Sequence, residues 1–396
     1  MVRLKSILIA GVVAVPALLQ AADFNWYGSY KQGVYFVTDL PDSGDKHTYS
    51  TFQADNGNTW LGISNIGANV KGDKYAGQIE LRIGNPKASG SKVYINQAWG
   101  SVDFTDKLGL TVGITGTPFW VASAFQGYAG EVDQLCYGGR RGHNDNVMLY
   151  QLNINSSGPV SGKFALIHNE GDINPIAEIS GKDDAEILES KVYGSVPQMQ
   201  ASASYKSDVF NANLAGAFQT FNLKYKTDAT GDKEFSDAEN VDVASWAFGF
   251  DVGLKFGKVS LLGGFSYGQN TQNMGIPTSA DVSQPYYNDN GARQVTPPCS
   301  GILLDGELTN TMMWGAPFSI TFNFTENAGL TVGYGISSIK IDMEDEKAVT
   351  QSSVFANAKF KKACFTFIPE VGFLNYDDYN EAPNQLYYGL FTQVDL

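Results

Sequence analysis

The sequence has few histidines, few cysteines and few basic residues. It holds three His and three Cys, and its 27 Lys and Arg stand against 41 Asp and Glu, so that the net charge is −14. Proteins that bind nucleic acid usually present a basic surface, and this balance argues against that class. No histidine pair has a metal-ligand spacing such as HExxH. We expect no cofactor, no metal ion and no nucleic-acid partner.

Long apolar runs are also missing, apart from one at the start of the chain. The first 22 residues, MVRLKSILIAGVVAVPALLQAA, have a basic beginning, an apolar middle and a small-residue end. This order is typical of a secretory signal peptide, and the apolar run is too short for a membrane-spanning helix. We expect a signal peptide at 1–22 and a single domain at 23–396. Loss of Arg3 and Lys5 with the signal peptide would take the net charge to −16.

Glycine and aromatic residues are abundant, with 43 Gly, 24 Phe and 20 Tyr. Such residues suit a β-sheet better than a helical core. Between Phe318 and Ile341 the chain reads FSITFNFTENAGLTVGYGISSIKI. Apolar residues alternate with small or polar residues on both sides of the TENAG link, which predicts two strands with one apolar and one polar face.

The same alternation recurs along the chain and predicts about sixteen strands. No amphipathic-helix pattern competes with it. The strands are expected near 24–38, 58–70, 75–84, 92–104, 108–116, 146–155, 162–169, 192–206, 209–225, 242–256, 259–269, 302–324, 328–341, 351–361, 364–376 and 385–396.

The connections between these strands alternate in length. The short ones lie at 71–74, 105–107, 206–208, 257–258, 326–329 and 361–363. The long ones lie at about 39–57, 85–91, 117–145, 170–191, 226–241, 270–301, 342–350 and 377–384. A transmembrane β-barrel has short periplasmic turns and long outer loops. The sequence therefore predicts an all-β fold, a transmembrane antiparallel β-barrel of about 16 strands.

A barrel accounts for the two different faces of each strand. Phe318 and Ile320 are expected to meet lipid, whereas Ser319 is expected to line a wet interior. Asp251 and Glu370 fall on the predicted inner face, in keeping with the cost of a charge at the bilayer midplane. Closure of the sheet leaves no unpaired backbone edge in hydrocarbon.

Several segments resemble the general bacterial porins of Gram-negative outer membranes. FNWYGSYKQGVYF is similar to the first strand of that family. INQAWGSVDFTDKLGLTVGITGTPF resembles its fourth strand, tight turn and fifth strand, and RRGHNDNVMLYQLN resembles the opening of its sixth. The chain departs from the family at Trp60 and Ile114, where Arg is frequent, and in ending FTQVDL rather than in Phe or Trp.

The resemblance implies a homotrimer in the outer membrane whose third loop, about 117–145, folds into the lumen. Opposed charges across such a constriction would orient dipolar solutes and set the ion preference. The pore-constriction residues implied in this way are the acidic Glu131 and Asp133 and the basic Arg140, Arg141, Lys31 and Arg82.

The cysteines leave two alternatives open. Cys136 and Cys299 fall in long loops on the same predicted side of the membrane, so that a disulfide could join them. Three free thiols are an equal alternative, because a sequence shows no geometry. Cys364 falls beside a short turn, too far from either loop to pair with it.

The function expected from these patterns is passive diffusion of small hydrophilic solutes and ions through an outer-membrane porin, with a mild cation preference from the acidic composition. The expected partners are outer-membrane lipid and lipopolysaccharide, and no enzyme activity is expected. One alternative is a channel selective for a sugar or an organic acid. Others are a barrel that anchors surface loops for adhesion, and an outer-membrane enzyme that depends on His143 or His168.

Overall fold

The structure is a computed structural model of the 396-residue chain. It describes residues 23–41, 46–50, 63–83, 93–119, 124–127, 147–156, 158–167, 190–193, 196–225, 239–276, 286–287, 293–294, 302–304, 307–342, 348–377 and 383–396. The expected signal peptide, 1–22, lies outside the described residues.

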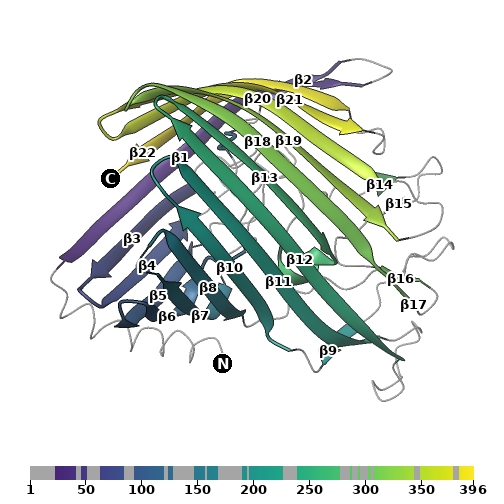
Figure 1. Cartoon of the computed structure of the whole chain (residues 1–396). Coiled ribbons are helices and arrows are strands. Elements are labelled where there is room, and N and C mark those ends of the chain that lie inside the picture. The colour runs from purple at the N-terminus through teal and green to yellow at the C-terminus, as the bar shows by residue number, and fades with distance from the viewer. Residues whose placement is uncertain are drawn as a thin grey trace.

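Sixteen of the described strands form one closed antiparallel ring (Figure 1). The ring closes because β1 pairs with β22 on one side, with Tyr30 opposite Val394, and with β3 on the other. This confirms the predicted fold class. The strands are β1 (Asp23–Leu40), β3 (Ile63–Lys71), β4 (Tyr75–Ile83), β5 (Val93–Thr105), β6 (Leu108–Thr115), β7 (Val147–Asn155), β8 (Val160–Ile167), β10 (Gln198–Lys206), β11 (Phe210–Tyr225), β12 (Glu239–Phe256), β13 (Val259–Gln269), β18 (Thr311–Thr325), β19 (Ala328–Ile341), β20 (Val349–Lys362), β21 (Phe365–Asp377) and β22 (Asn384–Asp395).

Short elements add to this ring at its long-loop end. β2 (Thr48–Ser50) extends the pairing of β1, and β9 (Ser190–Tyr193) extends that of β11. The remaining elements are the pairs β14 (Tyr286–Tyr287) with β15 (Arg293–Gln294) and β16 (Ile302–Leu304) with β17 (Glu307–Thr309), and a 3-10 helix, η2 (Thr271–Met274). No helix among the described residues is long and apolar enough to cross a membrane.

Two of the predicted strands are wrong in their extent. The strand expected over 192–206 is divided, because Pro197 has no N–H for the ladder and β10 begins directly after it. The strand expected over 302–324 begins only at Thr311. Leu304 pairs with Glu307 in a separate small hairpin, and the two residues between them are Asp-Gly, a favoured hairpin connection.

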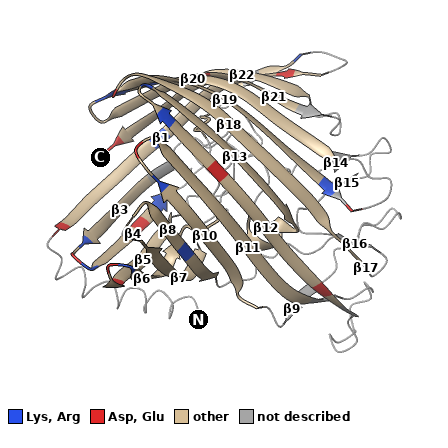
Figure 2. Cartoon of the chain, viewed as in Figure 1, with Lys and Arg blue, Asp and Glu red and all other residues tan. Residues whose placement is uncertain are grey.

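The two faces of the ring differ as the alternation predicted. On β18, Phe318 and Ile320 expose 48% and 43% of their surface on the outer face, whereas Ser319 exposes 3% on the inner face. Asp251 and Glu370 are both 4% exposed on the inner side. Figure 2 shows tan along most of each strand, with charged residues mainly near the strand ends. The outer face is therefore compatible with hydrocarbon.

The tight turns lie together at one end of the barrel. The β12–β13 turn is Gly257-Lys258, and Gly257 has φ 57°, a left-handed conformation that glycine adopts without steric cost. In the β20–β21 turn, Ala363 has φ 53° and the neighbouring Cys364 is exposed with a free thiol. Cys364 thus lies in a short turn, as expected.

Candidate functional site in the barrel lumen

The described start of the connection after β6 lies against the inner wall of the barrel. Its first described residues end at Phe119, whose side chain is fully buried. The Phe119 N–H donates to Oε1 of Gln200 on β10 at 2.9 Å. The Phe119 ring packs in an apolar cluster whose other members are Ala215, Ala217, Ala247, Met274 and Ile276. The wall that holds Phe119 is therefore made by β10, β11 and β12.

The next described residues, 124–127, lie against a different wall. We call them the anchored segment. The Phe125 carbonyl accepts a hydrogen bond from Asn357 Nδ2 at 2.9 Å. Gln126 Nε2 donates to the hydroxyl of Tyr387 at 2.7 Å, and the Gly127 N–H donates to Oε2 of Glu370 at 2.7 Å. These contacts fix the anchored segment to inner-face side chains of β20, β21 and β22.

Glu370 is the centre of this attachment. Its Oε2 also accepts a hydrogen bond from Asn357 Nδ2 at 3.0 Å. A buried carboxylate needs such donors, because burial without them would cost several kcal/mol. Glu370 was predicted to line the lumen. Its role in holding residues 124–127 was not, because it lies 243 positions from Gly127 in the chain.

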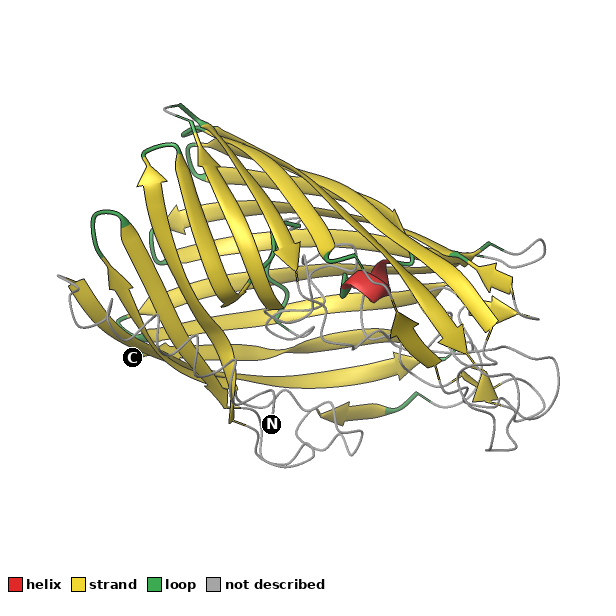
Figure 3. Cartoon of the chain, turned by 90° about the horizontal axis from the view of Figure 1, so that it is seen from below, coloured by secondary structure: helices red, strands yellow, loops and turns green. Residues whose placement is uncertain are grey.

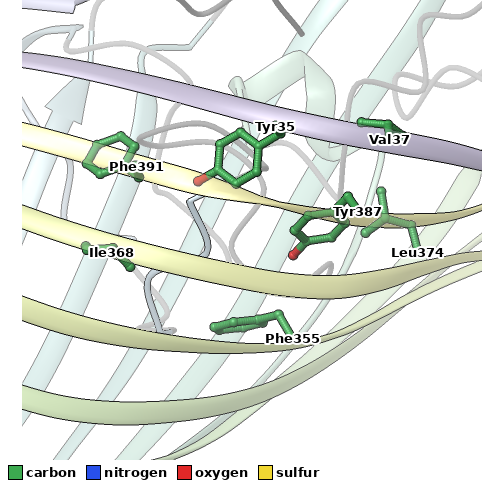
Figure 4. Close-up of a cluster of buried hydrophobic side chains, with 7 residues drawn as sticks. All are labelled: Tyr35, Val37, Phe355, Ile368, Leu374, Tyr387 and Phe391. Atoms are coloured by element: carbon green, nitrogen blue, oxygen red, sulfur yellow. The ribbon is translucent and has the colours of Figure 1, made fainter. Parts of the chain in front are cut away.

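The fit at Gly127 leaves no room for a side chain. A Cβ added to Gly127 would stand 2.3 Å from the hydroxyl oxygen of Tyr35 and 3.2 Å from Cβ of Phe391. Tyr35 and Tyr387 contact each other edge to face, with ring centroids 6.1 Å apart. Figure 4 shows both rings in the buried cluster formed by Tyr35, Val37, Phe355, Ile368, Leu374, Tyr387 and Phe391.

The connection after β6 contacts both of these walls within a short stretch of chain. Phe119 and Ala124 are only five positions apart in the chain, and each contacts a different part of the ring. Five extended residues reach at most about 18 Å, at ~3.6 Å per residue. The described pieces of this connection therefore lie on two different parts of the inner wall.

A second connection also enters the barrel. Residues 270–276, which we call the second inward segment, follow β13 and contain η2, drawn in red within the ring in Figure 3. Gln198 Nε2 donates to the Met274 carbonyl at 3.1 Å, and Asn273 Nδ2 donates to Ser245 Oγ at 3.1 Å. Met274 and Ile276 touch the same cluster as Phe119. Sequence reasoning missed this segment, because 270–276 reads as the start of an ordinary polar loop.

The residues implied for the constriction are only partly described. Glu131, Asp133, Arg140 and Arg141 lie outside the described residues, as do Cys136 and Cys299. Lys31 pairs with Gln393 and shares the inner face of β1 with Tyr35. Arg82 pairs with Asn65 and shares the inner face of β4 with the buried Glu80. Both basic residues are on the predicted face, and their role at a constriction stays a prediction.

Glu80 is another buried carboxylate, and unlike Asp251 and Glu370 it was not singled out from the sequence. It is 6% exposed, and its Oε2 accepts a hydrogen bond from the hydroxyl of Tyr27 at 2.8 Å. Asn96 Nδ2 donates to its other oxygen. Tyr27 in turn accepts a hydrogen bond from Gln78 Nε2 at 2.6 Å. Glu80 is thus held by the wall of β1, β4 and β5.

A cavity of about 520 Å³ lies on the short-turn side of the anchored segment, and we call it the chamber. Ala124 and Phe125 form part of its lining on the side of the anchored segment. Its walls are inner-face residues of β13 and of β18 to β22. Lys359, Lys361 and Asp395 supply its charges. No group of three or more potential metal ligands occurs within the described residues.

Comparison with solved structures identifies this architecture. No model of a known protein family matches the sequence, and no curated protein sequence does. The outer-membrane channel DcaP of Acinetobacter baumannii is 13% identical over 94% of this chain and 97% of that one, with a TM-score of 0.63. The chain has the porin fold.

Two further structures agree with the porin fold. The anion-selective porin from Comamonas acidovorans is 10% identical over 94% of this chain and 99% of that one, with a TM-score of 0.53. OmpT of Vibrio cholerae, an outer-membrane protein solved in trimer form, is 10% identical over 95% of this chain and all of that one, with a TM-score of 0.50. The resemblance drawn from the first strands therefore holds for the fold, and the closed ring with its apolar outer face is the architecture of an integral outer-membrane barrel.

Proposed function

We propose that the protein is a passive diffusion channel for small hydrophilic solutes and ions in the outer membrane of a Gram-negative bacterium. The observation that carries this proposal is the pair of opposite faces on one closed ring. The outer face is apolar, whereas the inner face carries hydroxyls, amides and charges. A wet interior of this kind conducts water-soluble molecules across hydrocarbon. The proposal includes no enzyme activity.

Conductance tests this proposal directly. Purified protein in a planar bilayer is expected to give stable step currents in simple salt solution. A sealed barrel that only anchors surface loops would give negligible current, and this result would contradict the proposal. Neutralising the implied loop acids, with Glu131→Gln and Asp133→Asn together, is expected to change both the step size and the ion preference.

The ion preference belongs to the same proposal. The net charge of −14 favours a mild excess of cations in and around the pore. Two of the described inner carboxylates, Glu80 and Glu370, are buried in hydrogen bonds to the wall and do not meet permeating ions directly. The preference is therefore expected to be weak. A reversal potential measured across a salt gradient gives its sign and size.

A homotrimer embedded in outer-membrane lipid and lipopolysaccharide completes the proposal. Its support is the exposed aromatic and aliphatic outer face, together with the trimer form of the Vibrio cholerae structure. Native mass spectrometry in mild detergent is expected to give three copies per particle. A single copy at every detergent concentration would contradict this part and leave the conductance proposal untouched.

A further inference from the structure

The chamber below the anchored segment has a cationic group that forms no ion pair with any carboxylate in the described part of the chain. Lys361 Nζ lies 3.7 Å from Asp395 Oδ2, and both side chains are about half exposed. Lys359 also lines the chamber, and among the described residues it pairs with no carboxylate. The two lysines and the single aspartate leave one net positive charge in this lining. The acidic average of the chain is therefore reversed locally.

The part of the chamber nearest the anchored segment is apolar and aromatic. The rings of Phe125 and Phe391 contact each other with centroids 5.0 Å apart and an interplanar angle of 64°. Ile368 and Leu262 add aliphatic surface to the same cavity. Phe125 is fixed in place, because its carbonyl accepts the hydrogen bond from Asn357. The apolar surface is thus positioned before any solute arrives.

Hydroxyl groups line the side of the chamber formed by β13, β18 and β19. Ser260, Thr321 and Thr331 contribute to this lining. The Thr321 and Thr331 hydroxyls lie 3.0 Å apart and hydrogen-bond to each other. The chamber therefore joins the Lys359 ammonium, a fixed aromatic edge and a polar wall in a single space.

We propose that the chamber is a subsite for a small organic monocarboxylate with a compact apolar body. This inference rests on the proposed channel function and names a class of solute for it. The Lys359 ammonium binds the carboxylate, and the surface of Phe125 and Phe391 contacts the body. One net positive charge complements one carboxylate. A solute cation would be repelled by the ammonium of Lys359, and a neutral solute would gain only the apolar contact.

The test uses single-channel recording of the full-length protein with three solutes of one shape. Benzoate, benzamide and benzylamine differ mainly in charge. Benzoate is expected to block the current in a saturable way. The concentration of benzamide that halves the current is expected to be at least about tenfold higher than that of benzoate, a difference of ~1.4 kcal/mol in binding free energy. Benzylamine is expected to block no better than benzamide.

Two variants locate the block. Lys359→Gln is expected to raise the half-blocking concentration of benzoate by about five- to tenfold, and Lys359→Arg is expected to keep it within about twofold. Lys163→Gln is the matched control, because Lys163 lies on the inner face of β8 beside Ala165 and does not line the chamber. It is expected to leave the block unchanged.

The outcomes separate this inference from the channel proposal. A protein that gives no current fails the channel proposal itself. A conducting protein that benzoate does not block, or that it blocks equally in Lys359→Gln, overturns the subsite alone. Lys359→Arg keeps the positive charge, so block retained in this variant and lost in Lys359→Gln assigns the effect to the charge. A folding defect would appear instead as loss of step currents.

Discussion

The carboxylate of Glu370 accepts a hydrogen bond from the backbone N–H of Gly127 at 2.7 Å, on the inner wall of the barrel. This contact joins strand β21 to the connection that follows β6. A charged acceptor makes the bond stronger than one between neutral groups. The anchored segment is therefore attached at a fixed point of the wall, and its attachment can be weakened by changing a single side chain.

Replacing Glu370 is expected to loosen the anchored segment. Glu370→Gln keeps the size of the side chain but removes its charge, and its one amide oxygen accepts less well from both Gly127 and Asn357. The expected result is greater open-channel current noise and a loss of about 1–3 kcal/mol in the free energy of unfolding. Glu80→Gln is the control, since Glu80 is also buried but its hydrogen bonds come from Tyr27 and Asn96 rather than from the anchored segment. Equal noise in both variants would contradict the assigned role of Glu370.

Gly127→Ala is expected to displace the same segment by steric overlap. The added Cβ would stand 2.3 Å from the Tyr35 hydroxyl oxygen, far closer than two such atoms can approach. The step conductance is therefore expected to change. Adding Tyr35→Phe removes that oxygen and is expected to recover part of the original conductance. A double mutant no closer to the original than Gly127→Ala alone would show that the overlap is not the cause.

Truncation of the second inward segment is expected to destabilise the barrel. Met274 and Ile276 are both fully buried beside Phe119. Met274→Ala or Ile276→Ala is expected to lower the free energy of unfolding by about 2–5 kcal/mol, because a cavity remains. Denaturant unfolding in detergent micelles measures this change. Val354→Ala, on the exposed outer face of β20, is expected to cost much less in the same measurement.

A lysine introduced on the outer face of β19 is expected to have a different effect from a lysine introduced on its inner face. Val332 is 46% exposed on the outer face, whereas its neighbour Thr331 lines the chamber. Val332→Lys is expected to cost about 2–4 kcal/mol of stability in lipid, as a lysine near the bilayer midplane does. Thr331→Lys is expected to fold and to shift the reversal potential toward anions. Comparable stability losses in the two variants would contradict the assignment of the faces.

Much of the fold was predictable from the sequence because a strand displays its two faces with a period of two. Phe318, Ser319 and Ile320 were assigned to the correct faces by alternation alone. The alternating loop lengths then indicated a closed barrel. Two strand limits were predicted wrongly where local chemistry interrupts the alternation, at Pro197 and at the Asp-Gly pair before Glu307.

The site was predictable only in part. Glu370, Lys31 and Arg82 were placed on the inner face, but no pattern indicated that residues 124–127 would meet Glu370 or that residues 270–276 would fold inward. Period-two alternation identifies a face and carries no information about depth along the pore or about which loop reaches it. Lys359 shows the same limit, because only the structure shows that Lys361, and not Lys359, lies beside Asp395.

The sequence by itself determined the class of fold and the direction of each strand face, since burial in lipid or water acts on neighbouring residues within a few positions. Only the tertiary structure decided which distant side chains share the lumen. The closure of the ring brings β1 beside β22 and the anchored segment beside β20 to β22, and these distances depend on the whole circumference rather than on any local pattern.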